Sequence, residues 1–213
     1  MLKPRLSRVP KKNIIIHSEN YLIRTLRADD ASDRWADWMS DPQVINMMNM
    51  PVQHWTKKHV VKYINRFDQR TRLLLGIFVK QTSTHIGILT IELRPAPGEF
   101  LVNMLIGEPD YRNKDVATEI TVPFRDYVFE TLGLTTMRAT VLAHNAVINH
   151  YLRKTGWKLD GTVKRHIKSH SDGTKLDVCL YRITRDEWRA WKAANHSPSA
   201  GAAYAKTAAI RST

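Results

Sequence analysis

A segment near the middle of the chain combines the features of an anion-binding site. Phe100 to Gly107 is an apolar run typical of a buried strand, and a turn and a helix start follow it. The first N–H groups of a helix have no partner within the helix, and the helix dipole adds positive potential at that end. A helix that starts directly after a strand points these groups beyond the strand end. Ile106 to Glu119 is therefore predicted to bind a pyrophosphate.

The same segment resembles the acetyl-CoA motif of GNAT acetyltransferases, which runs Arg or Gln, two residues, Gly, one residue, Gly or Ala. Arg112 and Ala117 match its first and last positions, and Thr118-Glu119 matches the usual continuation. Asn145 to Trp157 is similar to the family's second motif, in which an Asn opens a helix, a Tyr lies on it and Gly-Phe ends it. The resemblance covers most of the chain and is greatest to the branch of ribosomal-protein N-terminal acetyltransferases.

This resemblance implies the GNAT fold, an α/β fold whose mixed sheet is mostly antiparallel, with a central parallel pair and helices on both faces. It implies acetyl-CoA as cosubstrate, no metal, and a primary amine, such as a protein N-terminus, a small amine, an aminoacyl group or an amino-sugar nucleotide, as acceptor. The residues expected to bind acetyl-CoA are Leu105, Ile106, Gly107, Arg112, Asn113, Lys114, Asp115, Val116, Ala117, Thr118 and Asn145.

Two positions of the first motif depart from the family pattern. Asn113 and Asp115 stand where glycine is frequent, and glycine permits close approach of the backbone to a ligand. The Asp115 carboxylate suits a helix N-terminus but repels a nearby pyrophosphate. Arg112 and Lys114 are expected to offset that charge.

The resemblance also implies catalytic roles. Tyr151 matches the general acid that protonates the CoA sulfur; the alternative is a tyrosine that packs against Trp157. Asn145 matches a residue that holds the pantetheine or a water, and it is also a candidate helix N-cap. The oxyanion donor is expected to be a backbone N–H near Leu105 to Gly107.

The general base and the acceptor site are less defined. Glu92 is the first candidate for the base, on a strand next to the predicted centre; Glu108 is a second, and both are also candidates for plain surface charges. For the acceptor, the apolar stretch from Asp41 to Trp55 is interpreted as a loop. Its large side chains, which either line the acceptor pocket or pack on the sheet, are Met47, Met48 and Trp55.

The elements that must position these residues follow from apolar periodicity. Strands are predicted at Tyr21–Leu26, Leu73–Lys80, His85–Leu93, Phe100–Gly107, Met137–Leu142, Trp157–Lys164 and Lys175–Ile183. Helices are predicted at Asp29–Met39 (capped by Asp29 or Asp30), Thr56–Arg70, Asp115–Leu132, Ala146–Lys154 and Asp186–Ala194.

Composition bounds the remaining possibilities. The net charge is +13, and seven of these charges come from residues 1–18 and 195–213, which contain no acidic residue. We expect a basic N-terminal extension (1–18), one acetyltransferase domain (19–194) and a flexible C-terminal tail (195–213). A single cysteine and no long apolar run indicate a cytoplasmic protein that is not bound to a membrane. The basic charge makes an anionic acceptor a candidate. The oligomeric state is open between monomer and homodimer. Two alternatives to an enzyme remain: a GNAT-fold module without turnover, and RNA binding through the basic ends.

Overall fold

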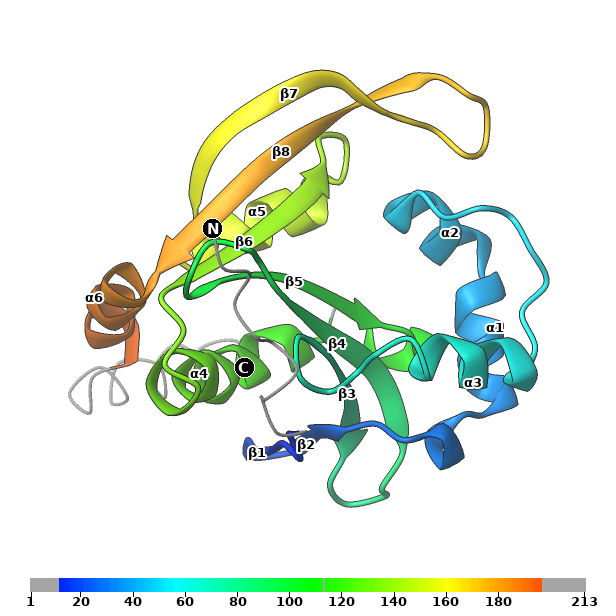
Figure 1. Ribbon diagram of the computed structural model, residues 1–213, viewed down its shortest axis with the longest axis horizontal. Helices are drawn as coiled ribbons and strands as arrows, with labels where there is room; N and C mark the ends of the chain where they lie inside the picture. Colours follow the sequence, from blue (N-terminus) through cyan, green and yellow to red (C-terminus); the bar gives the residue numbers. More distant parts are fainter. Residues whose placement is uncertain (1–11, 113, 197–213) are drawn as a thin grey trace, which may run out of the picture.

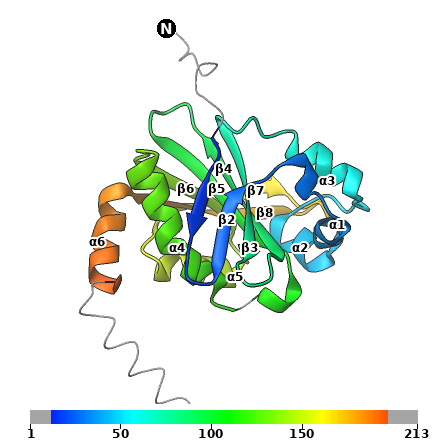
Figure 2. The ribbon, with the colours of Figure 1, turned by 90° about the horizontal axis from the view of Figure 1, so that it is seen from below.

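The computed structural model describes residues 12–112 and 114–196, which form one eight-stranded sheet with helices on both faces (Figures 1 and 2). The strands are β1 (Ile15–His17), β2 (Tyr21–Thr25), β3 (Arg72–Val79), β4 (His85–Leu93), β5 (Glu99–Ile106), β6 (Thr136–Leu142), β7 (Lys158–Lys168) and β8 (Lys175–Thr184). The helices are α1 (Asp33–Ser40), α2 (Pro42–Met48), α3 (Lys57–Ile64), α4 (Val116–Asp126), α5 (Ala146–Lys154) and α6 (Arg185–His196). The order across the sheet is β1-β2-β3-β4-β5-β6-β8-β7.

Strand β3 shows how the sequence builds two hydrophobic layers. Successive side chains of a strand point to opposite faces, so its continuous apolar run is buried on both sides. Leu73, Leu75 and Ile77 pack in the cluster that α4 completes, whereas Leu74 and Phe78 pack in the cluster that α1 and α3 complete. Figure 2 shows α4 on one side of the strands and α1 to α3 on the other.

The central strands β5 and β6 are the only parallel pair in the described sheet, as the family resemblance implied. They are in register over three residues, Glu99 to Leu101 against Thr136 to Arg138. Beyond these pairs β5 stays with β4 up to Ile106, and β6 stays with β8 up to Leu142. The two strands therefore separate toward their carboxyl ends, and the edges that face each other there lack strand partners.

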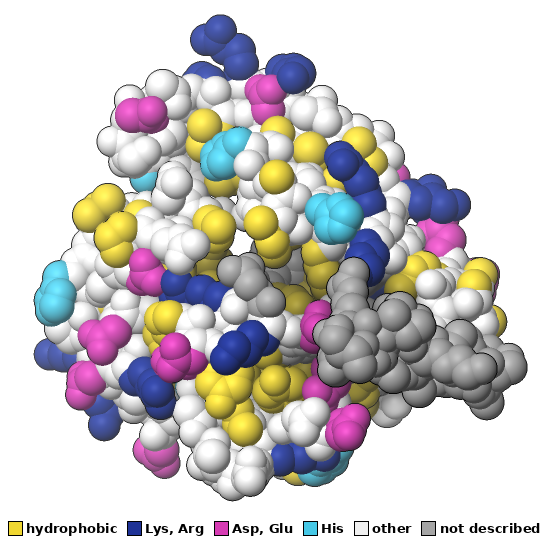
Figure 3. All heavy atoms as spheres, turned by 180° about the vertical axis from the view of Figure 1, so that it is seen from behind, with side chains coloured by type: hydrophobic (Ala, Val, Ile, Leu, Met, Phe, Trp, Pro, Cys, Tyr) yellow, Lys and Arg dark blue, Asp and Glu magenta, His cyan; other side chains and the backbone are white. Residues whose placement is uncertain are grey.

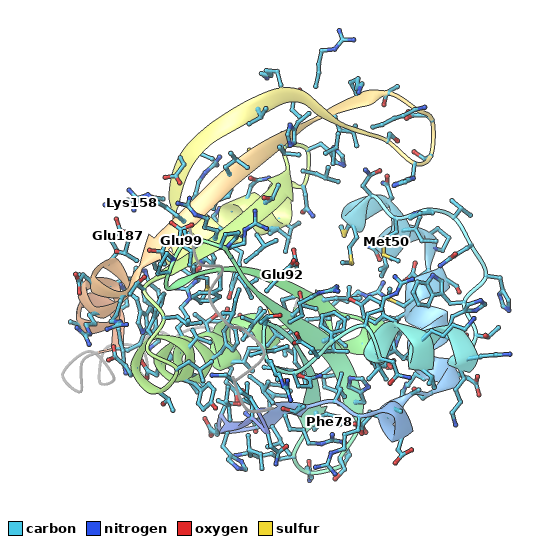
Figure 4. All side chains as sticks on the ribbon, viewed as in Figure 1. Met50, Phe78, Glu92, Glu99, Lys158 and Glu187 are labelled. Carbon is cyan, nitrogen blue, oxygen red and sulfur yellow. The ribbon has the colours of Figure 1, made fainter. Side chains whose placement is uncertain are left out.

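A charged cluster fixes the paired ends of β5 and β6. Arg138 on β6 donates to both carboxylate oxygens of Glu99 on β5, with Nε–Oε2 2.9 Å and Nη2–Oε1 3.0 Å. These hydrogen bonds keep the pKa of Glu99 below its usual value. The ion pairs continue through Asp160 of β7 and Arg182 of β8. Beside them, Lys158 at the start of β7 pairs with Glu187 of α6 (Figure 4). Each pair is partly exposed and weak alone, but the bidentate contact defines where the strands begin to separate.

Several element boundaries differ from the sequence prediction. The helix predicted from Asp29 begins at Asp33, because Ser32 and not an aspartate is its N-cap; the Ser32 Oγ accepts from Trp35 N–H at 3.2 Å. The stretch interpreted as a loop contains α2, which has Asp41 as N-cap and proline in its first turn, a combination that favours a helix start. The helix after Thr56 ends at Ile64 rather than Arg70.

Helix α4 begins one residue after its predicted start and changes character in its last turns. Pro123 has no N–H to donate to the carbonyl of Glu119, and the helix continues as a π-helical turn over Tyr127–Thr131. Gly133, at φ +69°, follows the helix end as predicted.

The ends of the chain lie only partly in the described region. Strand β1 falls within the predicted N-terminal extension, yet Ile14 and Ile16 are buried in the core and β1 pairs with β2. At the other end, α6 runs to His196. The rest of both predicted terminal segments, residues 1–11 and 197–213, lies outside the described residues. None of the described helices is long and apolar enough to cross a membrane.

Candidate active site

A cavity of about 620 Å³ lies where β5 and β6 separate. Its walls come from the carboxyl ends of both strands, the cavity-facing sides of α4 and α5, and α2. Figure 3 shows a hollow rimmed by hydrophobic side chains on the face of the molecule seen from behind. The topology thus brings the two motifs, which are distant in sequence, to the same space.

The start of α4 faces this cavity. Lys114, Asp115, Ala117 and Thr118 are among the lining residues. Hydrogen bonding within the helix begins with Glu119, whose N–H donates to the Asp115 carbonyl at 2.8 Å. The N–H groups of Ala117 and Thr118 precede that bond, at the helix start where the sequence predicts free donors.

Arg112, the first residue of the motif, lines the cavity but has its guanidinium engaged within the protein. It donates to the carbonyls of Ile106 (3.3 Å) and Gly107 (2.5 Å), and it forms an ion pair with Asp41 at 2.7 Å. These contacts hold the start of α2 against the end of β5. Structural support is therefore one role of Arg112, which the motif alone did not reveal.

Gly107 and Val116 lie behind the cavity wall and are not among its lining residues. A Cβ built on Gly107 would come within 2.2 Å of the Trp38 ring, so glycine is required there by packing. Val116 is 1% exposed and belongs to the core. The other predicted acetyl-CoA residues, Asn113 excepted, do line the cavity; Asn113 lies outside the described residues.

Tyr151 on α5 places its hydroxyl against α4. The phenol oxygen bonds the Thr121 hydroxyl and lies 3.2 Å from the Ala117 carbonyl. Burial raises the pKa of Tyr151 above its usual value, although the nearby Arg125 cation opposes that shift. A raised pKa keeps the phenol protonated at neutral pH, which is the state that a proton donor requires.

Asn145 is the N-cap of α5 and also lines the cavity. Its Oδ1 accepts from Ile148 N–H at 3.2 Å, which is the predicted capping interaction. A buried neighbour, Asn149, was missed by the sequence analysis. Its amide donates to the carbonyls of Leu142 (3.0 Å) and Asn145 (2.8 Å), so it shapes the turn that presents Asn145.

The side of the cavity nearest α2 is apolar with a few amides. Met47 and Met48 line it and remain about 40% exposed, together with Gln43, Asn49 and Asn103, which sequence reasoning missed. Trp55 does not line the cavity: its ring packs edge-on against Tyr63 of α3, at 6.0 Å between ring centres. Of the three large side chains, the two methionines therefore line the cavity, and Trp55 packs against α3.

Asn49 joins α2 to the hairpin of β7 and β8, which extends toward α2 in Figure 1. Its amide nitrogen donates to the Lys168 carbonyl at 2.9 Å, and its Oδ1 accepts from His170 N–H at 2.9 Å. Asn49 itself is left-handed, with φ +49°, a conformation that asparagine tolerates better than most residues. These two bonds close the side of the cavity nearest α2.

The two candidate bases lie away from the lining. Glu92 is exposed on β4 (Figure 4) and has the strand parity of Ile88, which packs on the side of α1 and α3. Glu108 is buried, and its Oε2 lies 2.6 Å from Nε of Arg34 in an ion pair. Neither carboxylate is among the residues around the cavity. In the described part of the chain, no group of three His, Cys, Asp or Glu side chains is arranged to hold a metal ion.

The strand edge and the helix start beside the cavity offer hydrogen-bond donors of the kind that acetyl-CoA requires. Directly after β5, the Gly107 N–H donates to the carbonyl of Ile86 on β4. Because successive N–H groups of a strand point to opposite sides, every second N–H group of β5 points to β4. By the same alternation the N–H groups of Met104 and Ile106 point to the side where β6 has separated. A free strand edge suits the amides of the pantetheine arm of CoA, and the start of α4 suits the pyrophosphate of CoA.

Comparison with known proteins agrees with this geometry. Residues 20–158 match the family described as Acetyltransferase (GNAT) domain. The N-acetyltransferase YoaA of Bacillus subtilis (strain 168), itself described as uncharacterized, is 20% identical over 176 residues, which are 80% of this chain and 97% of that protein.

Solved structures share the fold at low identity. Mycobacterium smegmatis RimJ in complex with CoA-disulfide has a TM-score of 0.72 at 18% identity, over 84% of this chain and 91% of that one. Spermidine N-acetyltransferase from Vibrio cholerae in complex with CoA and spermine has a TM-score of 0.70 at 15% identity, over 80% and 98%.

Proposed function

Because the chain belongs to the GNAT acetyltransferase family, we propose that it transfers the acetyl group of acetyl-CoA to a primary amine while both substrates are bound. The observation that carries this proposal is the cavity between β5 and β6, with the start of α4 on one side and Tyr151 inside it. Acetyl-CoA supplies an activated thioester carbonyl. The protein must orient that carbonyl, stabilise its oxygen and protonate the departing sulfur.

We assign the pyrophosphate to the N–H groups of Ala117 and Thr118, with the Lys114 ammonium as a nearby positive charge. The pantetheine amides then extend along the free edge of β5 from Met104 to Ile106. Asp115 opposes this arrangement, because its exposed carboxylate lines the same cavity. Binding is therefore proposed to rest on backbone donors, with a modest electrostatic cost from one side chain.

For the acetyl oxygen we propose the N–H of Ile106 as the oxyanion donor. The sequence left this donor open between Leu105 and Gly107. The Gly107 N–H already donates to the Ile86 carbonyl at 2.9 Å, and strand alternation points the Leu105 N–H toward β4. Ile106 is the remaining candidate, and Arg112 holds the next peptide plane by donating to the Ile106 carbonyl.

We propose Tyr151 as the general acid. Its hydroxyl is held by Thr121 and Ala117 of α4, and its raised pKa keeps the proton available at neutral pH. Proton transfer to the sulfur breaks the O–H bond and leaves the electron pair on the phenol oxygen. For the amine proton we retain Glu92 as the proposed base, acting through water because its carboxylate is outside the cavity lining.

The acceptor side favours an amine carried on an uncharged group. In the described lining, Asp115 is the only carboxylate, and it lies at the start of α4 rather than beside Met47, Met48 and Asn49. A polyamine needs negative charge for each of its additional ammonium groups, whereas a peptide N-terminus offers amides and an apolar side chain to such a wall. We therefore propose a peptide or other uncharged amine as the acceptor, in preference to a polyamine.

The test is an acceptor screen that measures free thiol released from acetyl-CoA, preceded by calorimetric titration with acetyl-CoA. Peptides that begin with small or apolar residues should release CoA faster than spermidine at equal concentration. A preference for spermidine would refute the acceptor class. Tight CoA binding with no release from any amine would instead support a module without turnover.

A further inference from the structure

Arg125 on α4 is a buried cation with no carboxylate partner in the described part of the chain. It is 3% exposed, and its Nη1 and Nη2 donate to the Thr155 carbonyl (2.6 Å) and hydroxyl (3.1 Å). The neighbouring Asp126 is engaged elsewhere, by Lys192 at 2.5 Å and by the Trp188 indole N–H. Burial of an unpaired charge is costly, so its retention requires a physical reason.

Three tryptophan rings surround the guanidinium. Its central carbon lies 5.4 Å from the ring centre of Trp157, 5.1 Å from that of Trp188 and 6.0 Å from that of Trp191. Cation–π attraction from three rings offsets part of the cost of burial and holds the group in place. Burial lowers the pKa of Arg125 to about 10, which still leaves it charged at neutral pH.

A series of hydrogen bonds between α4 and the C-terminal end of α5 connects the Arg125 guanidinium to Tyr151. Thr121 and Arg125 are four residues apart on α4, and Thr155, the C-cap of α5, lies four residues after Tyr151. Thr121 contacts the Tyr151 hydroxyl, and Arg125 contacts Thr155. Thr155 Oγ1 in turn donates to the Tyr151 carbonyl at 2.9 Å. Both Arg125 and Tyr151 line the cavity.

We propose that Arg125 is an electrostatic positioning residue for the general acid: a fixed cation that stabilises the negative charge left on Tyr151 after proton transfer. The inference rests on the proposed function of Tyr151. When the phenol O–H bond breaks and the proton bonds the departing sulfur, the electron pair stays on the phenol oxygen. Arg125 provides the field that favours this charge, and the Thr121 hydroxyl can turn to donate to it. The amine releases one proton to water and the proposed base Glu92, and this proton is then relayed to the phenolate, which restores the phenol.

This arrangement explains why Arg125 has no carboxylate partner among the described residues. A paired aspartate or glutamate would cancel the field at Tyr151, whereas neutral rings and a threonine satisfy the guanidinium without adding negative charge. Of the groups that face Tyr151, Arg125 supplies the charge and Thr121 a hydrogen bond, and both oppose the upward effect of burial on the Tyr151 pKa.

The test measures ionisation at position 151 without requiring turnover. A fluorinated tyrosine whose phenol ionises near neutral pH is incorporated at position 151, and its ¹⁹F chemical shift is followed against pH in the full chain. Arg125→Met should raise the midpoint by about one unit or more, as expected for loss of a nearby opposite charge. Arg125→Lys, which keeps the charge, should recover most of that shift.

Matched variants separate charge from packing. Arg189→Met removes an exposed cation of α6 that pairs with Glu130. Thr155→Val removes the hydrogen bonds of the Thr155 hydroxyl, including the one from Arg125, but no charge. Both variants should leave the midpoint unchanged. Should Arg125→Met fail to fold in thermal melts, Arg125→Gln is the neutral replacement. An unchanged midpoint in a folded neutral variant would overturn the inference.

Turnover provides an independent second readout. With an active acceptor, the neutral variant should lower kcat about three- to tenfold at neutral pH, because a less stabilised phenolate makes a weaker acid. Absence of CoA release from the parent protein would contradict the proposed function while leaving the fluorine titration interpretable. A shifted midpoint with unchanged kcat would refute the role of Arg125 in the reaction.

Discussion

Substitution of Asp115 by asparagine tests the electrostatics of the pyrophosphate site with little disturbance of the fold. Asp115 is the N-cap of α4, it is exposed, and its side chain makes no capping hydrogen bond. Asparagine keeps the shape and the preference for an N-cap position while it removes the charge. Any change in CoA affinity therefore reports repulsion between the carboxylate and the ligand.

The expected magnitude follows from distance and screening. Two phosphate charges at about 6 Å in a water-like dielectric repel one carboxylate by roughly 1.4 kcal/mol in total. At physiological salt, with a Debye length of about 8 Å, roughly half of this repulsion remains. About 0.7 kcal/mol corresponds to a dissociation constant about threefold lower for Asp115→Asn.

The assay is calorimetric titration with CoA at low and at physiological ionic strength. The affinity gain should grow toward about tenfold as salt is removed, because screening weakens. Asp37→Asn, an exposed aspartate on α1 outside the cavity lining, is the matched control and should change the affinity little. Weaker binding by Asp115→Asn, or no change at either ionic strength, would refute the placement of the pyrophosphate at the start of α4.

Three further outcomes are expected. Gly107→Ala should lower the free energy of unfolding by about 1–3 kcal/mol in urea titrations, since the new Cβ meets the buried Trp38 ring; Gly161→Ala, with nothing within 4 Å of its Cβ, should be nearly neutral. Asn49→Gly keeps the left-handed backbone but removes both bonds to the hairpin, so KM for the acceptor should rise severalfold with CoA affinity unchanged; Ser83→Gly, also at positive φ, is the control, and an equal effect there would exclude the hairpin contact as the cause. Burial lowers the pKa of His85 to about 4, so the unfolded chain binds the proton first as pH falls; about 3 kcal/mol of stability should be lost between pH 6.5 and 4 and be absent from His85→Phe.

The sequence predicted most elements because their apolar periods are regular and their ends carry clear signals. The strand His85–Leu93 and the helix Ala146–Lys154 coincide with β4 and α5. Helix α2 was missed because its apolar residues are explained equally well by a loop that lines a pocket, although Asp41 followed by Pro42 favours a helix start. Strand β1 was missed because three residues are too few for a periodic pattern.

Residues of the site were predictable where a motif fixes the backbone and not where tertiary contacts decide. The start of α4 and the place of Tyr151 follow from the order of strand, turn and helix. The ion pair between Arg112 and Asp41, in contrast, joins segments that are far apart in the sequence and was not predicted. Thr121 and Arg125 carry one signal that sequence reasoning passed over: with Ala117 they recur every four residues on the face of α4 that meets α5.

The most direct test of the central claim compares the wild-type protein with Tyr151→Phe in the release of free thiol from acetyl-CoA by an active amine. The phenylalanine keeps the ring but removes the proton donor, so kcat should fall by about 10²- to 10⁴-fold. The calorimetric affinity for CoA should stay nearly unchanged in the same variant. An unchanged kcat in a folded Tyr151→Phe protein would contradict the assignment of the acid.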